Sequence, residues 1–189
     1  FPGPVGAHSS QAMSFNPATG LVYIPETELG GIYADPEGDL DEWQPKPNMA
    51  VNTGLGRPKN SPVPPPGKSS LVAWNPLTET RAWSIPLTGT VNGSTMTTAG
   101  NLVLQGQVTG ELTAYAADSG RKLWSFDAQT AVIAQPITYT VGGRQYVTVI
   151  AGWRGMGSAS GVKPEWEYRL QPRRVLTFAL DGKAQLPPV

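Results

Sequence analysis

Short apolar runs, separated by turns rich in Gly, Pro, Asn and Asp, follow one another along most of the chain. Runs of this kind, rich in β-branched and aromatic residues, are typical of strands, and they lack the i, i+3, i+4, i+7 spacing of a helix. Gly142-Gly143, between two such runs, is the signal of a two-residue hairpin. The pattern predicts eleven strands, over 12–15, 21–25, 70–75, 81–85, 95–98, 102–105, 111–116, 122–126, 134–140, 145–151 and 174–180.

Two segments of this pattern, LVAWNPLTETRAWSI (71–85) and LTAYAADSGRKLWSF (112–126), repeat one another. Their aligned pairs include Ala73 with Ala114, Thr78 with Ser119, and Trp83 with Trp124. The Ala pair and the Trp pair are each 41 residues apart, which falls within the ~40–45 residues of a four-stranded propeller blade. The predicted strands therefore group as four, four and three, which makes two antiparallel blades and about three quarters of a third.

A long segment between the second and third predicted strands, 26–69, shows no sustained periodicity and is rich in Pro and Gly, including Pro64-Pro65-Pro66. A loop of this length inside a compact domain is usually functional or disordered. We interpret it as an insertion on one face of the propeller. Two interpretations stay open: a cap or partner-binding arm, and a loop that only packs against that face.

Composition narrows the possible function classes. Lys and Arg (14) balance Asp and Glu (14), which excludes an electrostatic nucleic-acid binder and a polybasic membrane-surface binder. The absence of Cys excludes disulfide frameworks and thiolate zinc sites, and a single His excludes a multi-His metal site. With 22 Gly and 19 Pro a helical bundle is not expected, whereas 39% hydrophobic residues supply a core.

The ends of the chain suggest that it is part of something larger. No apolar run approaches the ~20 residues of a membrane span, and FPGPVGAHSS at the start lacks the features of a signal peptide. Three blades cannot close a ring, because propellers usually have about 4–8 of them. We therefore expect the chain to be processed or to be a piece of a longer propeller protein.

Four separated stretches resemble, in the right order, the C-terminal blades of pyrroloquinoline-quinone (PQQ)-dependent alcohol dehydrogenases: NPATGLVYIP (16–25), TMTTAGNLVLQGQVTGELTAYAADSGRKLWSF (95–126), QPITYTVGGRQYVTVIAGW (135–153) and RRVLTFALDGKAQLPP (173–188). The resemblance covers nearly all of the chain outside 26–69. It implies an all-β fold, in which residues 1–189 form the C-terminal part of one eight-bladed β-propeller of four-stranded antiparallel blades.

The repeat carries a degenerate form of the family's tryptophan-docking motif, Ala-x-Asp-x-x-Thr-Gly-x-x-x-Trp. The two copies are Ala73-x-Asn75-x-x-Thr78-Glu79-x-x-x-Trp83 and Ala114-x-Ala116-x-x-Ser119-Gly120-x-x-x-Trp124, and both lack the Asp. An indole ring on an outer strand can fill the gap between adjacent blades by burying ~150–250 Å². Trp83 and Trp124 are therefore expected to be structural.

The resemblance also implies a chemistry. Family members oxidise an alcohol to an aldehyde or ketone with PQQ and a calcium or lanthanide ion. The family's catalytic Asp, its metal ligands and its Cys pair lie in earlier blades, so no catalytic residue and no metal ligand is expected in this chain. The implied partners are the remaining N-terminal propeller polypeptide, a small alcohol and an electron acceptor such as a cytochrome c, and the implied location is the periplasm. Alone, the chain is expected to complete a propeller and a cofactor pocket but to be inactive.

Six residues are candidates for the wall of the cofactor pocket. In the family motif Gly-Gly-x-Asn-Trp, Ser9 and Ser10 stand where Asn and Trp are expected. Ser9 can still donate a hydrogen bond, but Ser10 cannot stack on a planar ring. The departure indicates either altered cofactor geometry or a substrate pocket enlarged for a bulky group, and a plain blade-entry loop remains the alternative. His8 is interpreted as a rim or surface residue rather than a base.

The other four candidates precede or follow inner strands. The family's Trp-x-Gly-Gly-Thr segment reads Val91-Asn92-Gly93-Ser94-Thr95 here, and backbone groups of Asn92 and Gly93 can approach a cofactor because Gly permits close contact. Trp153 and Arg154 fall in a family Gly-Trp-Gly-Gly run. Trp153 would wall the pocket and Arg154 would pair with a carboxylate. Tight packing of the strand ends is the alternative for both pairs.

A second function class stays open on the sequence alone. A propeller of the same repeat superfamily that has lost its cofactor would serve as a protein-binding scaffold. The departures at Ser9, Ser10 and Val91 favour this alternative, whereas the retained similarity over 95–126 favours the enzyme.

Overall fold

The computed structural model describes residues 2–3, 6–32, 41, 44–45, 47, 67–152 and 171–188. These residues form eleven strands and no α-helix, which confirms the predicted all-β class. The strands are β1 (Ser14–Asn16), β2 (Leu21–Glu28), β3 (Lys68–Asn75), β4 (Thr80–Leu87), β5 (Thr95–Thr98), β6 (Leu102–Gly106), β7 (Glu111–Ala116), β8 (Lys122–Asp127), β9 (Ile137–Val141), β10 (Arg144–Ala151) and β11 (Arg174–Ala179).

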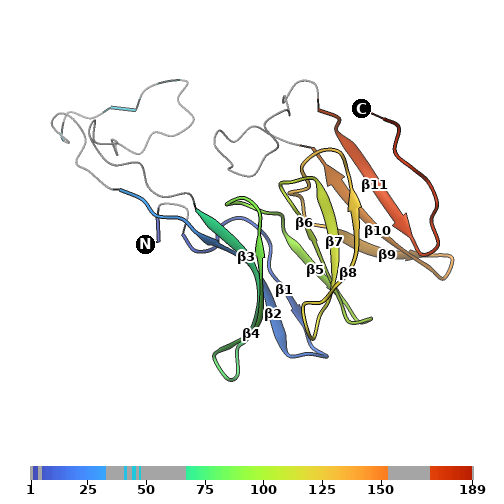
Figure 1. The fold of residues 1–189 in the computed structure, drawn as a ribbon, viewed down its shortest axis with the longest axis horizontal. Helices are drawn as coiled ribbons and strands as arrows, with labels where there is room; N and C mark the ends of the chain where they lie inside the picture. The colour runs from blue at the N-terminus through green and yellow to red at the C-terminus, as the bar shows by residue number, and fades with distance from the viewer. Residues whose placement is uncertain are drawn as a thin grey trace.

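The strands form three antiparallel sheets in chain order, with four strands (β1–β4), four (β5–β8) and three (β9–β11). Strands that are neighbours in sequence are neighbours in each sheet, so each sheet is a meander and corresponds to one blade. We call them the first, second and third blade. Figure 1 shows the three blades side by side in the same order as in the sequence. The predicted grouping of four, four and three strands is therefore confirmed.

Two apolar layers hold neighbouring blades together. The first joins the first and second blades and contains Leu21, Tyr23, Leu71, Ala73, Val103, Tyr115 and Ala117. The second joins the second and third blades and contains Leu112, Ala128, Val132, Val149, Ala151 and Leu176. Because strands alternate their side chains between two faces, each blade contributes one strand face to such a layer.

The docking role predicted for the two tryptophans is confirmed for Trp83, whereas Trp124 contacts the next blade but remains 41% exposed. The Trp83 indole Nε1 donates to the carbonyl oxygen of Ala117 at 3.1 Å, and its ring lies against Gly120, where an added Cβ would come within 2.9 Å of two ring carbons. The outer strand of the first blade thus packs on a turn of the second. Trp124 makes an edge contact with Phe178 of the third blade at 5.3 Å between ring centroids.

Most strands differ from their predicted bounds by one to three residues, and two of these differences bear on the argument. The predicted strand 134–140 begins only at Ile137, because Pro136 has no amide hydrogen to donate to a ladder. Both ends of the insertion predicted over 26–69 belong to strands β2 and β3 instead. Glu26 pairs with Ser70, and Glu28 pairs with Lys68. Most of the remaining insertion lies outside the described residues.

Candidate functional site

The segments that lead into the innermost strands, 6–13 before β1, 88–94 before β5 and 128–136 before β9, are joined to one another at one end of the blades. Backbone and side-chain hydrogen bonds run between them in sequence order. They join Ala12 N to Ser94 Oγ (2.9 Å), Thr95 N to Ala12 O (2.9 Å), Ser94 N to Ile133 O (3.2 Å) and Gln135 Nε2 to Thr95 O (3.3 Å). The structure therefore brings together the segments that carry four of the six predicted site residues.

Ser9 and Ser10 are exposed, and they occupy the middle of the first of these segments. His8 Nε2 contacts the carbonyl oxygen of Gln11 at 2.7 Å, so the imidazole spans the two serines. The segment is also tied to the first blade, because Thr27 N donates to Ala7 O at 2.8 Å. The two hydroxyl groups are thus presented on a loop whose flanks are fixed.

Asn92 is buried, with 3% of its surface exposed, and its side-chain amide is used within the protein. Its Nδ2 donates to Ser69 Oγ at 2.9 Å and to Thr88 O at 3.1 Å. Its Oδ1 accepts from Val108 N at 3.0 Å. The side chain therefore holds the 88–94 segment between the first and second blades.

Gly93 is also surrounded by protein. Its N–H donates to Gly106 O at 2.8 Å, and an added Cβ would lie 2.6 Å from Val132 O and 2.7 Å from Gly106 O. The backbone of neighbouring segments approaches Gly93 closely, which is the tight strand entry that the sequence analysis kept as the alternative to contact with a cofactor. Any larger residue at this position would push the entrances of the second and third blades apart.

Gln105 belongs to this arrangement, although the sequence analysis did not single it out. It is fully buried on β6, and its Nε2 donates to Gly93 O at 3.0 Å. The available signal was an amide side chain in the otherwise apolar run LVLQG. Polar residues at such core positions are buried only when they are hydrogen bonded, so this position points to a local polar role.

Trp153 and Arg154 lie outside the described residues. The strand that leads to them, β10, ends at Ala151, and Gly152 N donates to Ala131 O at 2.9 Å. The end of β10 therefore lies beside the segment that enters β9.

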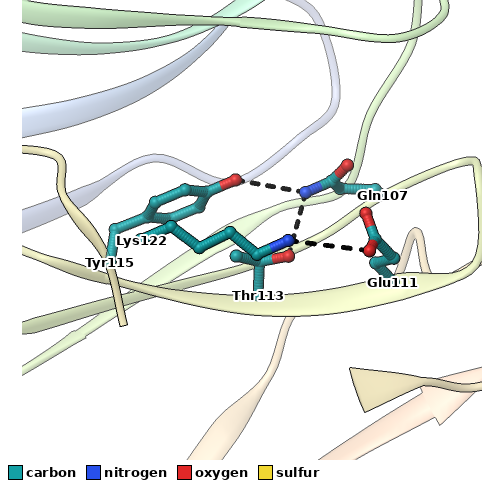
Figure 2. Close-up of polar contacts among 5 residues, drawn as sticks. All are labelled: Gln107, Glu111, Thr113, Tyr115 and Lys122. Carbon is teal, nitrogen blue, oxygen red and sulfur yellow. Dashed lines mark hydrogen bonds and ion pairs between the residues drawn. The ribbon is translucent and has the colours of Figure 1, made fainter. Parts of the chain in front are cut away.

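A second polar cluster lies in the second blade (Figure 2). Gln107 Nε2 donates to Thr113 Oγ1 at 3.0 Å and to Tyr115 OH at 3.1 Å, and Lys122 forms an ion pair with Glu111 at 3.6 Å. Burial raises the pKa of the Tyr115 phenol, although its hydrogen bonds act in the opposite direction. Because Gln107 lies in the loop after β6 and its two partners lie on β7, these hydrogen bonds hold the loop between the two strands.

The comparisons with known proteins identify the family. Residues 1–147 match the family model described as PQQ, "Glucose/ethanol/alcohol dehydrogenase, beta-propeller domain". The chain belongs to this family. Its three sheets are therefore blades of a PQQ-dehydrogenase-type β-propeller, as the resemblance implied.

Several relatives of this PQQ family share the whole length of the chain. It is 44% identical to quinohemoprotein alcohol dehydrogenase ADH IIB of Pseudomonas putida over 100% of the chain and 27% of that protein. It is 41% identical to quinohemoprotein alcohol dehydrogenase of Comamonas testosteroni over 98% of the chain and 26% of that protein. The chain thus spans about a quarter of the length of the curated relatives that it matches.

Solved structures of related dehydrogenases share the fold of this chain. The crystal structure of the Comamonas testosteroni quinohemoprotein alcohol dehydrogenase superimposes with a TM-score of 0.81, at 37% identity, over 100% of this chain and 28% of that one. A europium-containing methanol dehydrogenase matches with a TM-score of 0.59 at 23% identity, over 87% of this chain and 28% of that one, which shows the shared fold alone.

Proposed function

We propose that the chain is the C-terminal portion of a PQQ-dependent dehydrogenase that oxidises an alcohol to an aldehyde or ketone. One observation carries the proposal: the chain is 44% and 41% identical, over 100% and 98% of its length, to two proteins named quinohemoprotein alcohol dehydrogenase. PQQ, when bound, supplies the acceptor for the two electrons of the alcohol. The chain's own contribution is to complete the ring and one wall of the cofactor pocket.

The third blade supports the first part of this role. Within the described residues, β11 pairs only with β10, whereas the other two blades have a fourth strand. A groove of about 720 Å³ lies between the second and third blades, and apolar side chains of Trp124, Phe126, Leu176, Phe178 and Leu186 line it. We expect the remaining N-terminal polypeptide to supply the fourth strand at the outer edge of β11. Without that polypeptide the chain is expected to be inactive.

The donor set at the blade entrances fits part of a PQQ site. PQQ is a flat quinone with carboxylate groups, and exposed hydroxyls such as those of Ser9 and Ser10 are suitable hydrogen-bond donors to carboxylate oxygens. Asn92 and Gly93 would act by holding the neighbouring segment in place, because their polar groups already bond within the protein. Trp153 and Arg154 complete the proposed wall, with Arg154 pairing with a carboxylate.

The metal ion is proposed to come with the rest of the protein. The described residues contain no group of three or more His, Asp or Glu side chains that could hold a metal ion. Following the family resemblance, we place the ligands of a calcium or lanthanide ion in the remaining N-terminal polypeptide. One relative by fold is a europium-containing methanol dehydrogenase.

We further propose a cytochrome c as electron acceptor and the periplasm as location. A relative from Thauera butanivorans, 37% identical over 99% of the chain and 27% of that protein, is named 1-butanol dehydrogenase (cytochrome c). No helix among the described residues is long and apolar enough to cross a membrane.

Reconstitution of the full-length protein tests the function. The protein is loaded with PQQ and calcium, or with PQQ and a lanthanide, and supplied with primary and secondary alcohols and an artificial electron-accepting dye. We expect dye reduction that requires both PQQ and an alcohol. If no alcohol supports dye reduction although PQQ is bound, the enzyme proposal fails and a propeller with an idle cofactor remains.

A further inference from the structure

We propose that His8 is a positioning residue that holds Ser9 and Ser10 in place to receive a carboxylate of the quinone. This inference rests on the proposed function, because it takes the exposed serines as part of the PQQ site. Nothing in the sequence pattern assigned His8 more than a place at the rim. Its contact with Gln11, across the two serines, gives it a specific task.

The geometry fixes the direction of the hydrogen bond. His8 Nε2 lies 2.7 Å from the carbonyl oxygen of Gln11. A carbonyl oxygen only accepts hydrogen bonds, so Nε2 must carry the hydrogen and donate it. The imidazole ring thereby closes a four-residue loop from His8 to Gln11, with Ser9 and Ser10 in its middle. The ring is half-buried, whereas both serines are exposed.

Both flanks of the loop are tied to other strands. On the N-terminal side, Ala7 O accepts from Thr27 N of β2 at 2.8 Å. On the C-terminal side, Ala12 N donates to Ser94 Oγ at 2.9 Å, and Ala12 O accepts from Thr95 N at 2.9 Å. The His8–Gln11 bond braces the stretch between these anchors. It closes the loop across the two serines.

A braced loop favours binding because its ordering cost is met before the ligand arrives. Fixing a loop or a side chain on binding lowers affinity, so a loop already held in its bound shape binds more tightly. Two hydroxyl donors at adjacent positions suit an anionic carboxylate, which accepts several hydrogen bonds. Loss of the brace should weaken quinone binding without changing how the bound quinone reacts.

The test compares three variants of the full-length protein with the wild type. His8→Phe keeps a ring but removes the donor, and His8→Gln restores a side-chain N–H that can reach the Gln11 carbonyl. Asn75→Ala is the matched control, because Asn75 Oδ1 braces a turn at the opposite end of the first blade through Leu77 N. Each protein, loaded with calcium, is titrated with PQQ, and the melting temperature and kcat at saturating PQQ are measured.

We expect His8→Phe to raise the Kd for PQQ about five- to tenfold, which is the range for loss of one such hydrogen bond. His8→Gln and Asn75→Ala should stay within about twofold of the wild type, a spread well below the tenfold that 1.4 kcal/mol represents. All variants should keep kcat at saturating PQQ.

Two results would overturn the inference: an unchanged Kd in His8→Phe, or a Kd in His8→Gln raised as much as in His8→Phe, since the ring and not its donor would then matter. A wild-type protein that binds no PQQ would overturn the proposed function itself, and this inference with it. The two failures are therefore distinguished by the wild-type titration alone.

Discussion

Gly120 shows at the scale of one residue why the repeat carries Gly before its tryptophan. The residue adopts a φ of +72°, which side chains rarely tolerate, and its open surface receives the Trp83 ring of the preceding blade. The first copy of the motif has Glu79 at the equivalent position, also with a positive φ of 54°. Gly120 therefore combines a backbone requirement with a packing requirement.

A matched pair of substitutions separates the two requirements of Gly120. Gly20 has nearly the same φ, +69°, but an added Cβ meets nothing within 4 Å. Gly20→Ala should cost about 1 kcal/mol of unfolding free energy, from the backbone alone. Gly120→Ala should cost about 2–3 kcal/mol, because the new methyl group also displaces Trp83. Urea unfolding of the full-length protein measures both, and equal losses would mean that the ring contact contributes nothing.

The predicted site shows what sequence reasoning reached at this scale and what it did not. The motifs singled out the segments around Ser9 and around Gly93 as parts of one cofactor wall, and the structure shows that the two segments are hydrogen bonded to each other. They did not show that the Asn92 side-chain amide is already hydrogen bonded to Ser69, Thr88 and Val108, because the fold brings these partners together. Nor did they find Gln105, whose role depends on a carbonyl of another loop.

At the scale of elements, the seam between β1 and β5 is polar although the layers outside it are apolar. Ser14 Oγ donates to Thr95 Oγ1 at 2.9 Å, and Asn16 Nδ2 donates to Thr97 Oγ1 at 3.0 Å. Such bonds depend on direction and distance, so they fix the register of one blade against the next as well as holding the blades together. The hydrophobic pattern predicted the eleven strands, whereas these hydrogen bonds between blades can be seen only in the folded structure.

Asn16 and Asn75 offer a matched test of the seam. Each opens an Asn-Pro turn and accepts a turn N–H through Oδ1, but only Asn16 also reaches the next blade. Asn75→Ala should cost about 0.5–1 kcal/mol for the exposed turn bond. Asn16→Ala should cost about 1–3 kcal/mol, since it also removes the hydrogen bonds of the buried Asn16 amide to the half-buried Thr97 and Thr98. Thermal unfolding of the two variants checks this, and similar losses would contradict a stabilising seam.

At the scale of the whole molecule, the strand pattern and the family resemblance predicted the architecture, whereas many predicted strand ends were wrong by one to three residues. The predicted strand from Ala134 began late because Pro136 interrupts the ladder, and β2 continued past Pro25 to Glu28. Pairing with a neighbouring strand decides such ends, and a local pattern carries little information about it. The three-strand count of the third blade is the feature with the largest consequence for the complete ring.

Hydrogen exchange in the full-length protein tests the proposed fourth strand of the third blade. One set of alternating β11 amides donates to β10, and the other set points to the opposite edge of β11. With a fourth strand in place, both sets should exchange slowly, as in a central strand. Fast exchange of every second amide in β11 would show a free edge and would contradict the proposed closure.

The central claim is that these blades form part of a pocket in which PQQ accepts electrons from an alcohol. Its most direct measurement is the absorbance spectrum of the quinone bound to the full-length, metal-loaded protein, before and after anaerobic addition of a primary alcohol without dye. The account predicts one bound quinone per polypeptide and its complete reduction by the alcohol. A quinone that does not bind, or that binds and stays oxidised with every alcohol supplied, would contradict it.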